Sequence, residues 1–347
     1  IILLAGSVSW SETITLYATS MTQGRMEQCG CATNIEGGLE ARAGFLEQAR
    51  QENPDSILVD LGGFMPPKKE KKKSVFLLPN ENDIQTAVGE IQLRAMERLH
   101  YDVVLPSPND LSYGAKVLYA SPPFDFYLVS HLNPSPDWIA PYRIVSRNGL
   151  KIGMVGAVSL LDKTMKVGND FTITPFSQSV IQTIELVRNC EKADLVLLLA
   201  HEPPPTIRRW ITENQGLKID GVITLDFGIK VEKVGDTFLV NAPGKGRAIG
   251  KITIEWDRVN NTKSISSLRI PLDPQKYKNQ AMREFLTASY QQMLKELRPE
   301  HPRTNGMQEL PADNGYTGAE VCMSCHIEEY EQWKKTRHAS AFYDLLE

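Results

Sequence analysis

The sequence predicts an α/β protein with two packed mixed β-sheets flanked by helices, followed by a small helical module at the C-terminus. Short apolar, β-rich segments recur nine times between residues 14 and 256, and helical stretches lie between several of them. Strands that are apolar throughout and alternate with helices are typical of sheets covered on both faces. The number of strands favours two packed sheets over one.

The expected elements follow one another along most of the chain. The strands are expected at residues 14–19, 56–62, 101–106, 124–130, 150–159, 194–201, 220–225, 237–243 and 250–256. Helices are expected at residues 37–51, 82–100, 177–190 and 204–214, with a long amphipathic helix at 274–298. The segment 299–315 is rich in proline, glycine and asparagine, which is typical of a linker.

Length and charge limit the classes of function. A chain of 347 residues is long enough for one large domain and a smaller one. The formal net charge of −4 gives no indication of binding to nucleic acid or to an anionic membrane. No stretch reaches 18 apolar residues, so no membrane span is expected in the mature chain. The charged run 66–74 is bracketed by proline and serine and is expected to be a solvated loop.

The N-terminus suggests export. The chain opens IILLAGSVSWSE, a short apolar run followed by small and then polar residues. This pattern indicates the remnant of a secretory signal peptide over residues 1–12, with a first buried strand as the alternative. We therefore expect a signal remnant at 1–12, an α/β domain at 13–270, a helix and linker at 271–315, and the start of a further module at 316–347. The mature protein is then expected in the periplasm or outside the cell.

Residues 13–257 carry a series of segments in a familiar order. The segments are GGLEARAGFL (37–46), ILVDLGG (57–63), YDVV (101–104), KIGMVGAVS (151–159), ADLVLLLAH (193–201) and VNAPGKGRAIGKITIEWD (240–257). Their order and spacing resemble the calcineurin-like metallophosphoesterases, and within them the 5′-nucleotidase group. The resemblance implies a metallophosphoesterase-like sandwich of two sheets. In such enzymes two divalent metals clamp a phosphate and activate a water molecule.

The metal ligands that this family needs are largely missing. The family motifs supply aspartate, histidine and asparagine at strand ends, where this chain reads Ser20-Met21-Thr22-Gln23, Gly63, Ser107-Pro108-Asn109-Asp110 and Leu225-Asp226-Phe227-Gly228. Asn109 reaches a ligand position if the alignment slides by one residue. Only His201 matches a family ligand, and Asp226 is a possible substitute. One imidazole and one carboxylate cannot hold two metals, so a divalent metal centre is not expected.

Two interpretations of His201 remain open. It is either a polar residue at a strand end, hydrogen-bonded to a neighbouring loop, or part of a relic site for one metal. The crevice at the strand ends could still bind a ligand even without metals, because such crevices and the helix N-termini beside them are common binding places. Nothing in the sequence identifies that ligand.

The segment Cys322-Met323-Ser324-Cys325-His326 allows three interpretations. A zinc site needs four ligands, and no second Cys-x-x-Cys or His pair completes one. A thioredoxin-like redox pair follows a strand in an α/β unit, whereas this segment follows a linker. The third interpretation is covalent haem c, with two cysteine thioethers and His326 as the proximal iron ligand. The other cysteines, Cys29, Cys31 and Cys190, have no predicted role beyond structure.

The surrounding sequence favours the haem. Residues 316–342, YTGAEVCMSCHIEEYEQWKKTRHASAF, resemble the opening module of the multihaem cytochromes related to cytochrome c554. The resemblance implies that Cys322, Cys325 and His326 attach and ligate haem c, and that His338 is a further axial ligand. Trp333 is expected to pack against the porphyrin or the helix. The C-terminal module is thus predicted to be a small helical c-type haem module.

The sequence spacing between His326 and His338 limits whether both can ligate the same haem iron. Residues 326 and 338 are twelve apart, which is about 18 Å along a straight helix. Two axial nitrogens on one iron lie only about 4 Å apart, since each is about 2 Å from the metal. Either the chain doubles back between them, or His338 ligates a neighbouring haem. The second possibility implies further haem-binding sequence beyond Glu347.

These observations lead to one main hypothesis and two alternatives. The main hypothesis is an exported, multihaem electron-transfer protein that works with a redox partner protein, with the degenerate 5′-nucleotidase-like domain as scaffold or docking module. The first alternative is a phosphoesterase with unusual metal ligands, tethered to a cytochrome. The second is a binding module whose crevice senses a nucleotide or phosphate.

Overall fold

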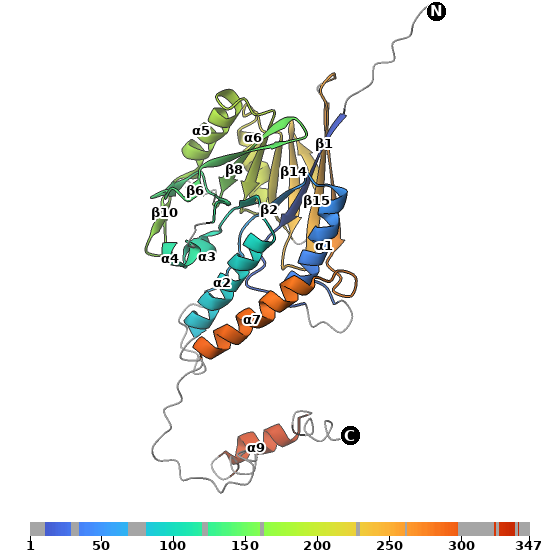
Figure 1. The fold of residues 1–347 in the computed structure, drawn as a ribbon. Helices are drawn as coiled ribbons and strands as arrows, with labels where there is room; N and C mark the ends of the chain where they lie inside the picture. Colours follow the sequence, from blue (N-terminus) through green and yellow to red (C-terminus); the bar gives the residue numbers. More distant parts are fainter. Residues whose placement is uncertain are drawn as a thin grey trace, which may run out of the picture. The chain divides into compact units, whose positions relative to one another are not determined.

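The structure is a computed structural model of residues 1–347 (Figure 1). It describes residues 11–28, 35–68, 81–119, 124–159, 163–226, 230–260 and 262–297, and, near the C-terminus, 323, 326–336 and 339. The chain divides into two compact units, which we call the first unit (1–297) and the second unit (298–347). The long helix expected at 274–298 lies in the first unit.

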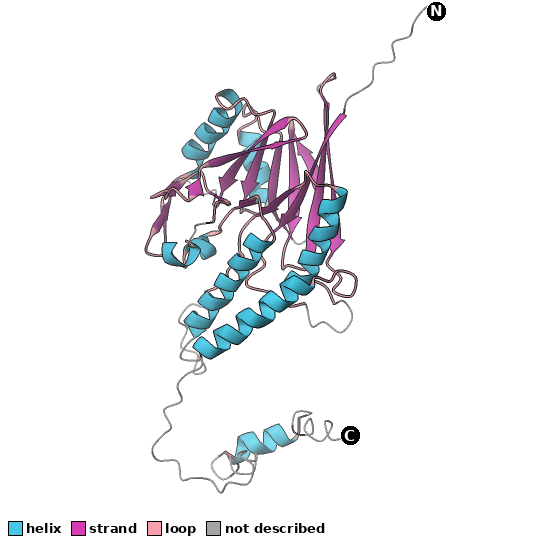
Figure 2. Cartoon of the chain, viewed as in Figure 1, coloured by secondary structure: helices cyan, strands magenta, loops and turns pink. Residues whose placement is uncertain are grey.

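A seven-stranded mixed sheet forms one half of the first unit (Figure 2). Its strand order is β16-β15-β1-β2-β3-β4-β6. The strands are β1 (Ser11–Thr19), β2 (Ile57–Asp60), β3 (Val103–Val104), β4 (Tyr127–Leu128), β6 (Ile139–Ala140), β15 (Ala248–Asp257) and β16 (Thr262–Pro271). In this sheet β1, β2, β3, β4 and β6 run parallel to one another, whereas β15 pairs antiparallel with both β1 and β16.

A six-stranded mixed sheet forms the other half, in the order β13-β14-β12-β11-β8-β7. The strands are β7 (Tyr142–Arg147), β8 (Leu150–Ala157), β11 (Leu195–Ala200), β12 (Gly221–Asp226), β13 (Val231–Val234) and β14 (Thr237–Pro243). Its four central strands are parallel and its two edge strands antiparallel. A small antiparallel sheet contains β5 (Leu132–Asn133), β9 (Met165–Val167) and β10 (Phe171–Ile173).

Strand β11 shows how the layers pack. All six of its residues are buried, which explains why its sequence, LVLLLA, is apolar without interruption. Leu195, Leu197 and Leu199 belong to the core shared with the seven-stranded sheet. The alternate residues face the helices α5 (Phe176–Asn189) and α6 (Pro204–Glu213) in a second core cluster. Because successive side chains of a strand point to opposite faces, one strand joins both layers.

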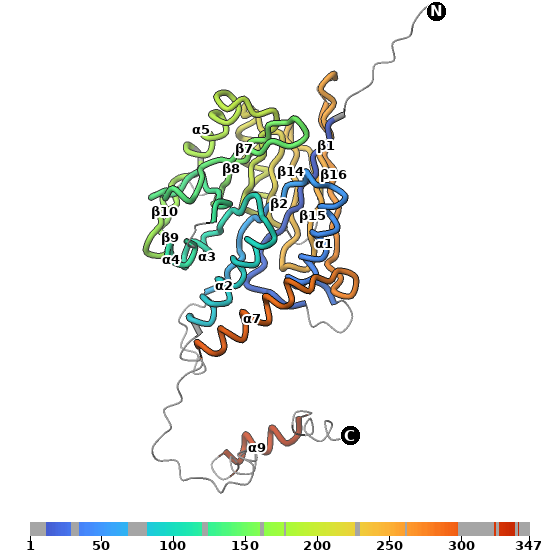
Figure 3. The backbone as a smooth tube through the Cα atoms, in the orientation of Figure 1, coloured from blue at the N-terminus to red at the C-terminus, as the bar shows by residue number. Residues whose placement is uncertain are grey.

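Three helices cover the outer face of the seven-stranded sheet (Figure 3). They are α1 (Leu39–Glu52), α2 (Glu81–Arg98) and α7 (Gln280–Glu296), and α7 contacts both of the others. Tyr17 of β1 meets Phe45 of α1 edge to face, with ring centroids 5.5 Å apart. Two short helices, α3 (Pro108–Leu111) and α4 (Ala115–Leu118), follow β3.

The predicted fold class is confirmed: mixed sheets flanked by helices make up the first unit. All nine expected strands and the five expected helices are present, within a few residues of their expected bounds. Seven further strands match none of the expected ranges: the short strands β5, β6, β9 and β10, and the longer strands β7, β13 and β16. The three longer ones have a common explanation. Each lies at an edge of a sheet, where one side meets solvent, so their sequences carry polar residues between the apolar ones.

The second unit contains helix α9 (Ile327–Lys334), which buries none of its residues. Ile327 is 63% exposed and Trp333 is 38% exposed, with Met323, one turn before the helix, at 42%. Across the described parts of the chain, no helix has the length and apolar character to cross a membrane.

Candidate functional site

The carboxyl ends of parallel strands from both large sheets meet around one hollow of about 360 Å³. Chain segments that follow β1, β2, β3, β8 and β11 supply its walls, so residues far apart in the sequence come together. We call it the strand-end hollow. Its lining residues are Met21, Gln23, Gly63, Met65, Pro67, Ser107, Pro108, Asn109, Val158, Ser159, His201 and Glu202. Crevices in this position are where open α/β sheets bind ligands.

Met21 and Gly63 fill the part of the hollow where the family motifs place two aspartates. A Cβ added to Gly63 would lie 2.5 Å from the Met21 sulfur and 3.1 Å from its Cα, which leaves no room for a side chain. Gly63 also has a φ of +72°, a conformation that side chains other than glycine rarely adopt. The thioether therefore occupies the space that a bridging carboxylate would need.

Asp60, the last residue of β2, precedes the turn that reaches the hollow at Gly63 and is fully buried. Its carboxyl group accepts hydrogen bonds from the Thr19 hydroxyl at 2.5 Å and the Gly62 N–H at 2.8 Å. Burial raises the pKa of Asp60 to about 7, against the effects of the Thr19 hydrogen bond and the nearby Arg42. Tyr101 extends this buried network, because its hydroxyl contacts both Thr19 and Arg42.

Asn109 and Asp110 hold loops rather than a ligand. The Asn109 amide donates to the carbonyls of Met65 at 3.3 Å and Pro66 at 3.1 Å, and its oxygen accepts from the Lys68 N–H at 3.2 Å. The buried Asp110 carboxyl accepts three backbone N–H bonds, from Gly63, Met65 and Ser107. Burial raises the pKa of Asp110 to about 6. Both polar groups that follow β3 are thus already engaged.

His201 lies directly after β11, and one of its ring nitrogens is committed to a neighbouring loop. Nδ1 lies 2.6 Å from the carbonyl oxygen of Leu61, so Nδ1 carries the proton and donates. Burial lowers the pKa of His201, which favours the neutral ring. A bond of this kind is expected if His201 is a polar residue at a strand end that is hydrogen-bonded to a neighbouring loop. Asp226 is the last residue of β12, and its side chain lies outside the described residues.

The residues present do not fit a dinuclear centre for hard divalent metals. Such metals prefer carboxylate, carbonyl and water oxygens, with several ligands for each ion. The hollow instead presents a thioether at Met21 and a glycine at 63, and the Asn109 amide is hydrogen-bonded to the loop. Among the described residues, no group of three histidine, cysteine, aspartate or glutamate side chains is placed to hold a metal.

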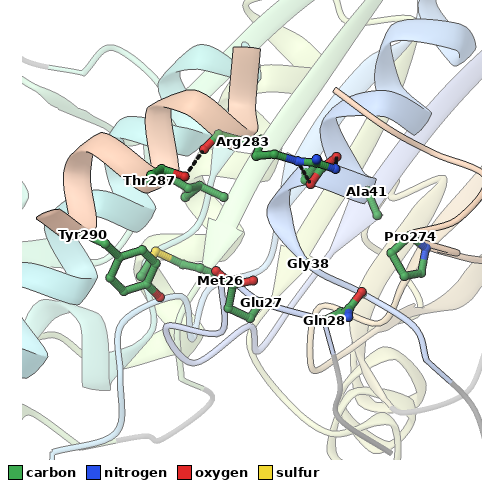
Figure 4. A pocket seen from close by; sticks show the side chains of 12 residues that line it. Met26, Glu27, Gln28, Gly38, Ala41, Pro274, Arg283, Thr287 and Tyr290 are labelled. Atoms are coloured by element: carbon green, nitrogen blue, oxygen red, sulfur yellow. Dashed lines mark hydrogen bonds and ion pairs between the residues drawn. The ribbon is translucent and has the colours of Figure 1, made fainter. Parts of the chain in front are cut away.

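A second hollow, of about 260 Å³, lies on the side of the first unit, between α7, the start of α1 and the loop 26–28 (Figure 4). Figure 4 shows Arg283 reaching from α7 toward α1, where its guanidinium binds the Glu40 carboxylate at 2.6 and 2.9 Å. That hydrogen bond lowers the pKa of Glu40. Because the Arg283 guanidinium and the Glu40 carboxylate neutralise each other, neither is available to bind a charged ligand in this hollow.

The second unit contributes one described residue of the predicted haem site. His326 precedes α9 as its N-cap residue, and its Nδ1 lies 3.9 Å from a carboxylate oxygen of Glu329. Exposed apolar side chains of Met323, Ile327 and Trp333 lie near it in sequence. An imidazole beside uncovered apolar side chains fits a haem, whose faces are apolar. Cys322, Cys325 and His338 lie outside the described residues, as do Cys29 and Cys31, whereas Cys190 is a free, exposed cysteine.

Helix α9 ends well before His338. Its last residue is Lys334, and the N–H groups of Lys335 and Thr336 bond three residues back, to Gln332 and Trp333. Such bonds close a helix in a tighter turn. A straight helix from 326 to 338 is therefore absent, and the chain has a place to change direction between the two histidines.

Solved structures with the same fold were found for the first unit. The 5′-nucleotidase precursor from Thermus thermophilus matches with a TM-score of 0.65 at 15% identity, over 82% of this chain and 59% of that one. The sulfate thiohydrolase SoxB from Thermus thermophilus matches with a TM-score of 0.64 at 14% identity, over 82% and 61%. This chain thus spans about three fifths of their length.

A shorter structure is matched almost completely. The calcineurin-like phosphoesterase YfkN from Bacillus subtilis gives a TM-score of 0.60 at 16% identity, over 83% of this chain and 99% of that one. The first unit has the fold of the 5′-nucleotidases and calcineurin-like phosphoesterases. At these identities the likeness concerns the fold alone.

The second unit matches a different family. Residues 321–347 match the model of the family described as "Cytochrome c554 and c-prime". The match is short, and it contains Cys322, Cys325, His326 and His338. Comparison with curated protein sequences found no match for the chain.

The sequence predicts a crevice at the strand ends but not how the hollow is filled. In the sequence alone, Met21 and Gly63 appear only as positions without the expected carboxylates. The signal that links them is chemical: a long apolar side chain replaces one ligand where the smallest residue replaces the other. His131 was also missed; it is buried, accepts from the Val158 N–H through Nε2 and pairs with the Thr174 carbonyl through Nδ1.

Proposed function

We propose that the protein is an exported electron-transfer protein that carries covalent haem c on its second unit. The observation that carries the proposal is that the motif Cys322-Met323-Ser324-Cys325-His326 lies inside the segment that matches the cytochrome c554 family model. The first unit, which has a phosphoesterase fold but not the ligands for a dinuclear centre, would serve as a scaffold or docking module.

Three residues would attach and ligate the haem. The thiols of Cys322 and Cys325 would form thioethers, and His326 would be the proximal ligand through Nε2. Bound haem supplies a one-electron iron couple. A carboxylate oxygen of Glu329 lies 3.9 Å from His326 Nδ1, beyond hydrogen-bond distance but on the side from which a group usually orients a ligating imidazole. The exposed apolar side chains of Ile327 and Trp333 could then pack against the apolar faces of the haem.

Export and partners follow from the same proposal. Haem c is attached outside the cytoplasm, which agrees with the apolar start of the chain. An electron carrier needs a donor and an acceptor, so we propose a redox partner protein. We also propose further haems, because His338 is available to a neighbouring iron unless the chain reverses after α9.

Covalent haem is tested by expressing the chain with a c-type cytochrome maturation system and recording a pyridine haemochrome spectrum. We expect a c-type spectrum, and its loss in Cys322→Ala because one thioether anchor is removed. Cys190→Ala is the matched control, since this free, exposed cysteine of the first unit should leave the spectrum unchanged. A spectrum without covalent haem, or one that Cys322→Ala does not alter, would refute the assignment.

The role of His338 is tested by its own substitution. If His338 completes the coordination of an iron in this chain, His338→Ala should convert a low-spin spectrum to a high-spin one. An unchanged spectrum in this chain, combined with a change in a longer chain that carries further haem motifs, would place His338 on a neighbouring haem. No change in either chain would contradict an axial role.

A metal-dependent phosphoesterase with unusual ligands is the second candidate function, and the fold of the first unit is the observation that favours it. Metal analysis combined with a phosphatase assay separates the two. Bound manganese, zinc or iron at two per chain, beyond the haem iron and accompanied by turnover, would overturn the scaffold role. We expect neither, because Met21 and Gly63 occupy the ligand positions.

A further inference from the structure

The strand-end hollow has lost the chemistry for phosphate. None of its described lining residues is lysine or arginine, and its one acidic lining residue is Glu202. A phosphate would meet no opposite charge there, and without two metals nothing else would neutralise it. The ligand that the hollow can bind therefore depends on its other lining groups, which include the His201 imidazole and the Met21 thioether.

The imidazole of His201 presents a lone pair. Its Nδ1 proton is donated to the Leu61 carbonyl at 2.6 Å, so Nε2 is the unprotonated nitrogen of a neutral ring. Burial lowers the pKa of His201, which favours the neutral ring. A ring held from Nδ1 by a carbonyl is the usual arrangement of a metal-ligating histidine.

The main chain of Met21 is fixed by two hydrogen bonds. Its N–H donates to the Gly62 carbonyl at 2.7 Å, and its carbonyl accepts from the Lys245 N–H at 3.1 Å. Met21 has a φ of +49°, a left-handed conformation that is unfavourable for this residue type and that these bonds maintain. The sulfur lies against Gly63, which has no side chain to displace it.

One short turn supports both groups. Leu61 fixes the His201 ring, Gly62 fixes the Met21 backbone, and Gly63 makes room for the sulfur. Met65 also lines the hollow, but its sulfur packs against Gly89 of α2, where an added Cβ would overlap it. The hollow thus has one imidazole nitrogen and one thioether sulfur supported by the same three residues.

We propose that the strand-end hollow binds one soft monovalent cation, copper(I), through His201 Nε2 and Met21 Sδ. Thioethers select copper(I), and imidazole binds copper well, whereas magnesium, calcium and manganese prefer oxygen ligands. The oxygen donors that line the hollow are those of Gln23, Ser107, Asn109, Ser159 and Glu202. Those of Ser107 and Asn109 are already hydrogen-bonded, as is the buried Asp110 carboxyl beside them. This site goes beyond the proposed electron-transfer function and does not depend on the haem.

The test is a titration of the haem-loaded full chain with copper(I), under anaerobic reducing conditions, against a chromophoric copper(I) chelator. Every protein compared carries Cys29→Ser, Cys31→Ser and Cys190→Ser, because free thiols would themselves bind copper(I). We expect one copper per chain. Met21→Leu keeps the apolar volume but removes the sulfur, and should weaken binding by about 100-fold or more, the upper end of what even outer-shell changes cost a metal site. Met65→Leu is the matched control, because its sulfur faces α2, and should bind as the natural chain does.

Two further measurements keep the result decisive. Copper X-ray absorption of the loaded protein should show a sulfur and a nitrogen scatterer, and the sulfur should disappear in Met21→Leu. Far-UV circular dichroism and a urea midpoint confirm that each variant is folded.

The proposal is overturned if copper binds no tighter than it does to the Met21→Leu/His201→Gln double variant, or if Met21→Leu and Met65→Leu behave alike. Loss of the haem motif cysteines should not alter copper binding, which separates this proposal from the haem assignment.

Discussion

Trp210 and Trp333 lie in the two units of the chain, in very different surroundings. Trp210 of α6 is 8% exposed and packs edge to face on Phe176, with ring centroids 5.0 Å apart. Trp333 of α9 is 38% exposed, and its described ring contact is with Tyr330 of the same helix. The first unit is stabilised by its own core, although the metal ligands of its fold are replaced. Helix α9 follows the motif Cys322-Met323-Ser324-Cys325-His326, the proposed haem-attachment site, and buries no residue.

This difference shows that a fold and its chemistry are maintained by separate sets of residues. The nucleotidase-like fold persists because buried strands such as β11 interlock two sheets and two helical layers. Its catalytic chemistry depends on a few strand-end residues, which can change without disturbing that core. The segment around α9 differs in both respects: α9 buries no residue of its own, and the proposed haem would supply the apolar surface.

The largest effect is expected from Trp210→Ala. Removing this buried indole should lower the free energy of unfolding of the first unit by about 3–5 kcal/mol, because it leaves a cavity in the core between the six-stranded sheet and its helices. The indole nitrogen has no hydrogen-bond partner, so no polar contact is lost with it. Urea unfolding followed by far-UV circular dichroism measures the change. Trp210→Phe should lose clearly less; equal losses would mean that the cavity is not the cause.

Asp110→Ala should follow, with a loss of about 3 kcal/mol. The three N–H groups of Gly63, Met65 and Ser107 would lose their acceptor, and each unpaired buried donor costs about 1–3 kcal/mol. The same unfolding experiment measures it. Asp125→Ala, at an exposed position, is the control and should change stability by less than about 0.5 kcal/mol. Similar losses in both variants would show that Asp110 does not organise the loops around the hollow.

The buried carboxyl groups also predict how the first unit responds to pH. The pKa of Asp60 in the folded chain is about 7, above that of an unfolded aspartate, so the folded state binds the proton more tightly. The contribution of Asp60 to stability is therefore largest at low pH and falls as pH rises from about 4 to about 7, by up to about 1.4 kcal/mol per pH unit. Asp110, with a pKa of about 6, acts in the same direction.

Asp60→Asn isolates this contribution. The amide cannot ionise, so the difference in unfolding free energy between the natural chain and the variant should shrink or reverse as pH rises through this range. Unfolding curves at several pH values between about 4 and 7 give that difference. A difference that grows with pH would mean that the ionised Asp60 carboxylate is stabilised in the fold by Arg42 and Thr19 more than burial destabilises it.

Sequence patterns predicted most of the fold because its strands are buried on both faces. The apolar runs at β8 and β11 are visible without any three-dimensional information. The edge strand β16 was not expected, because TKSISSLRIP mixes polar and apolar residues as a half-exposed strand does. At the site, the absence of ligands could be predicted from motif spacing. The contact between Met21 and Gly63 could not, because it joins two distant loops whose approach is set by the pairing of β1 with β2.

The smallest effect is expected from Trp333→Ala in the chain without haem. The side chain is 38% exposed and α9 buries no residue, so the unfolding free energy of the first unit should change by less than about 0.5 kcal/mol. In the haem-loaded chain the same substitution removes apolar surface from beside the proposed attachment site. In the haem-loaded chain, Trp333→Ala should shift the reduction potential of the haem or the temperature at which its spectrum is lost, because both depend on how far the haem is exposed to water. If Trp333→Ala alters the haem-free chain as Trp210→Ala does, α9 is stabilised by contacts with protein and the contrast between the two units fails.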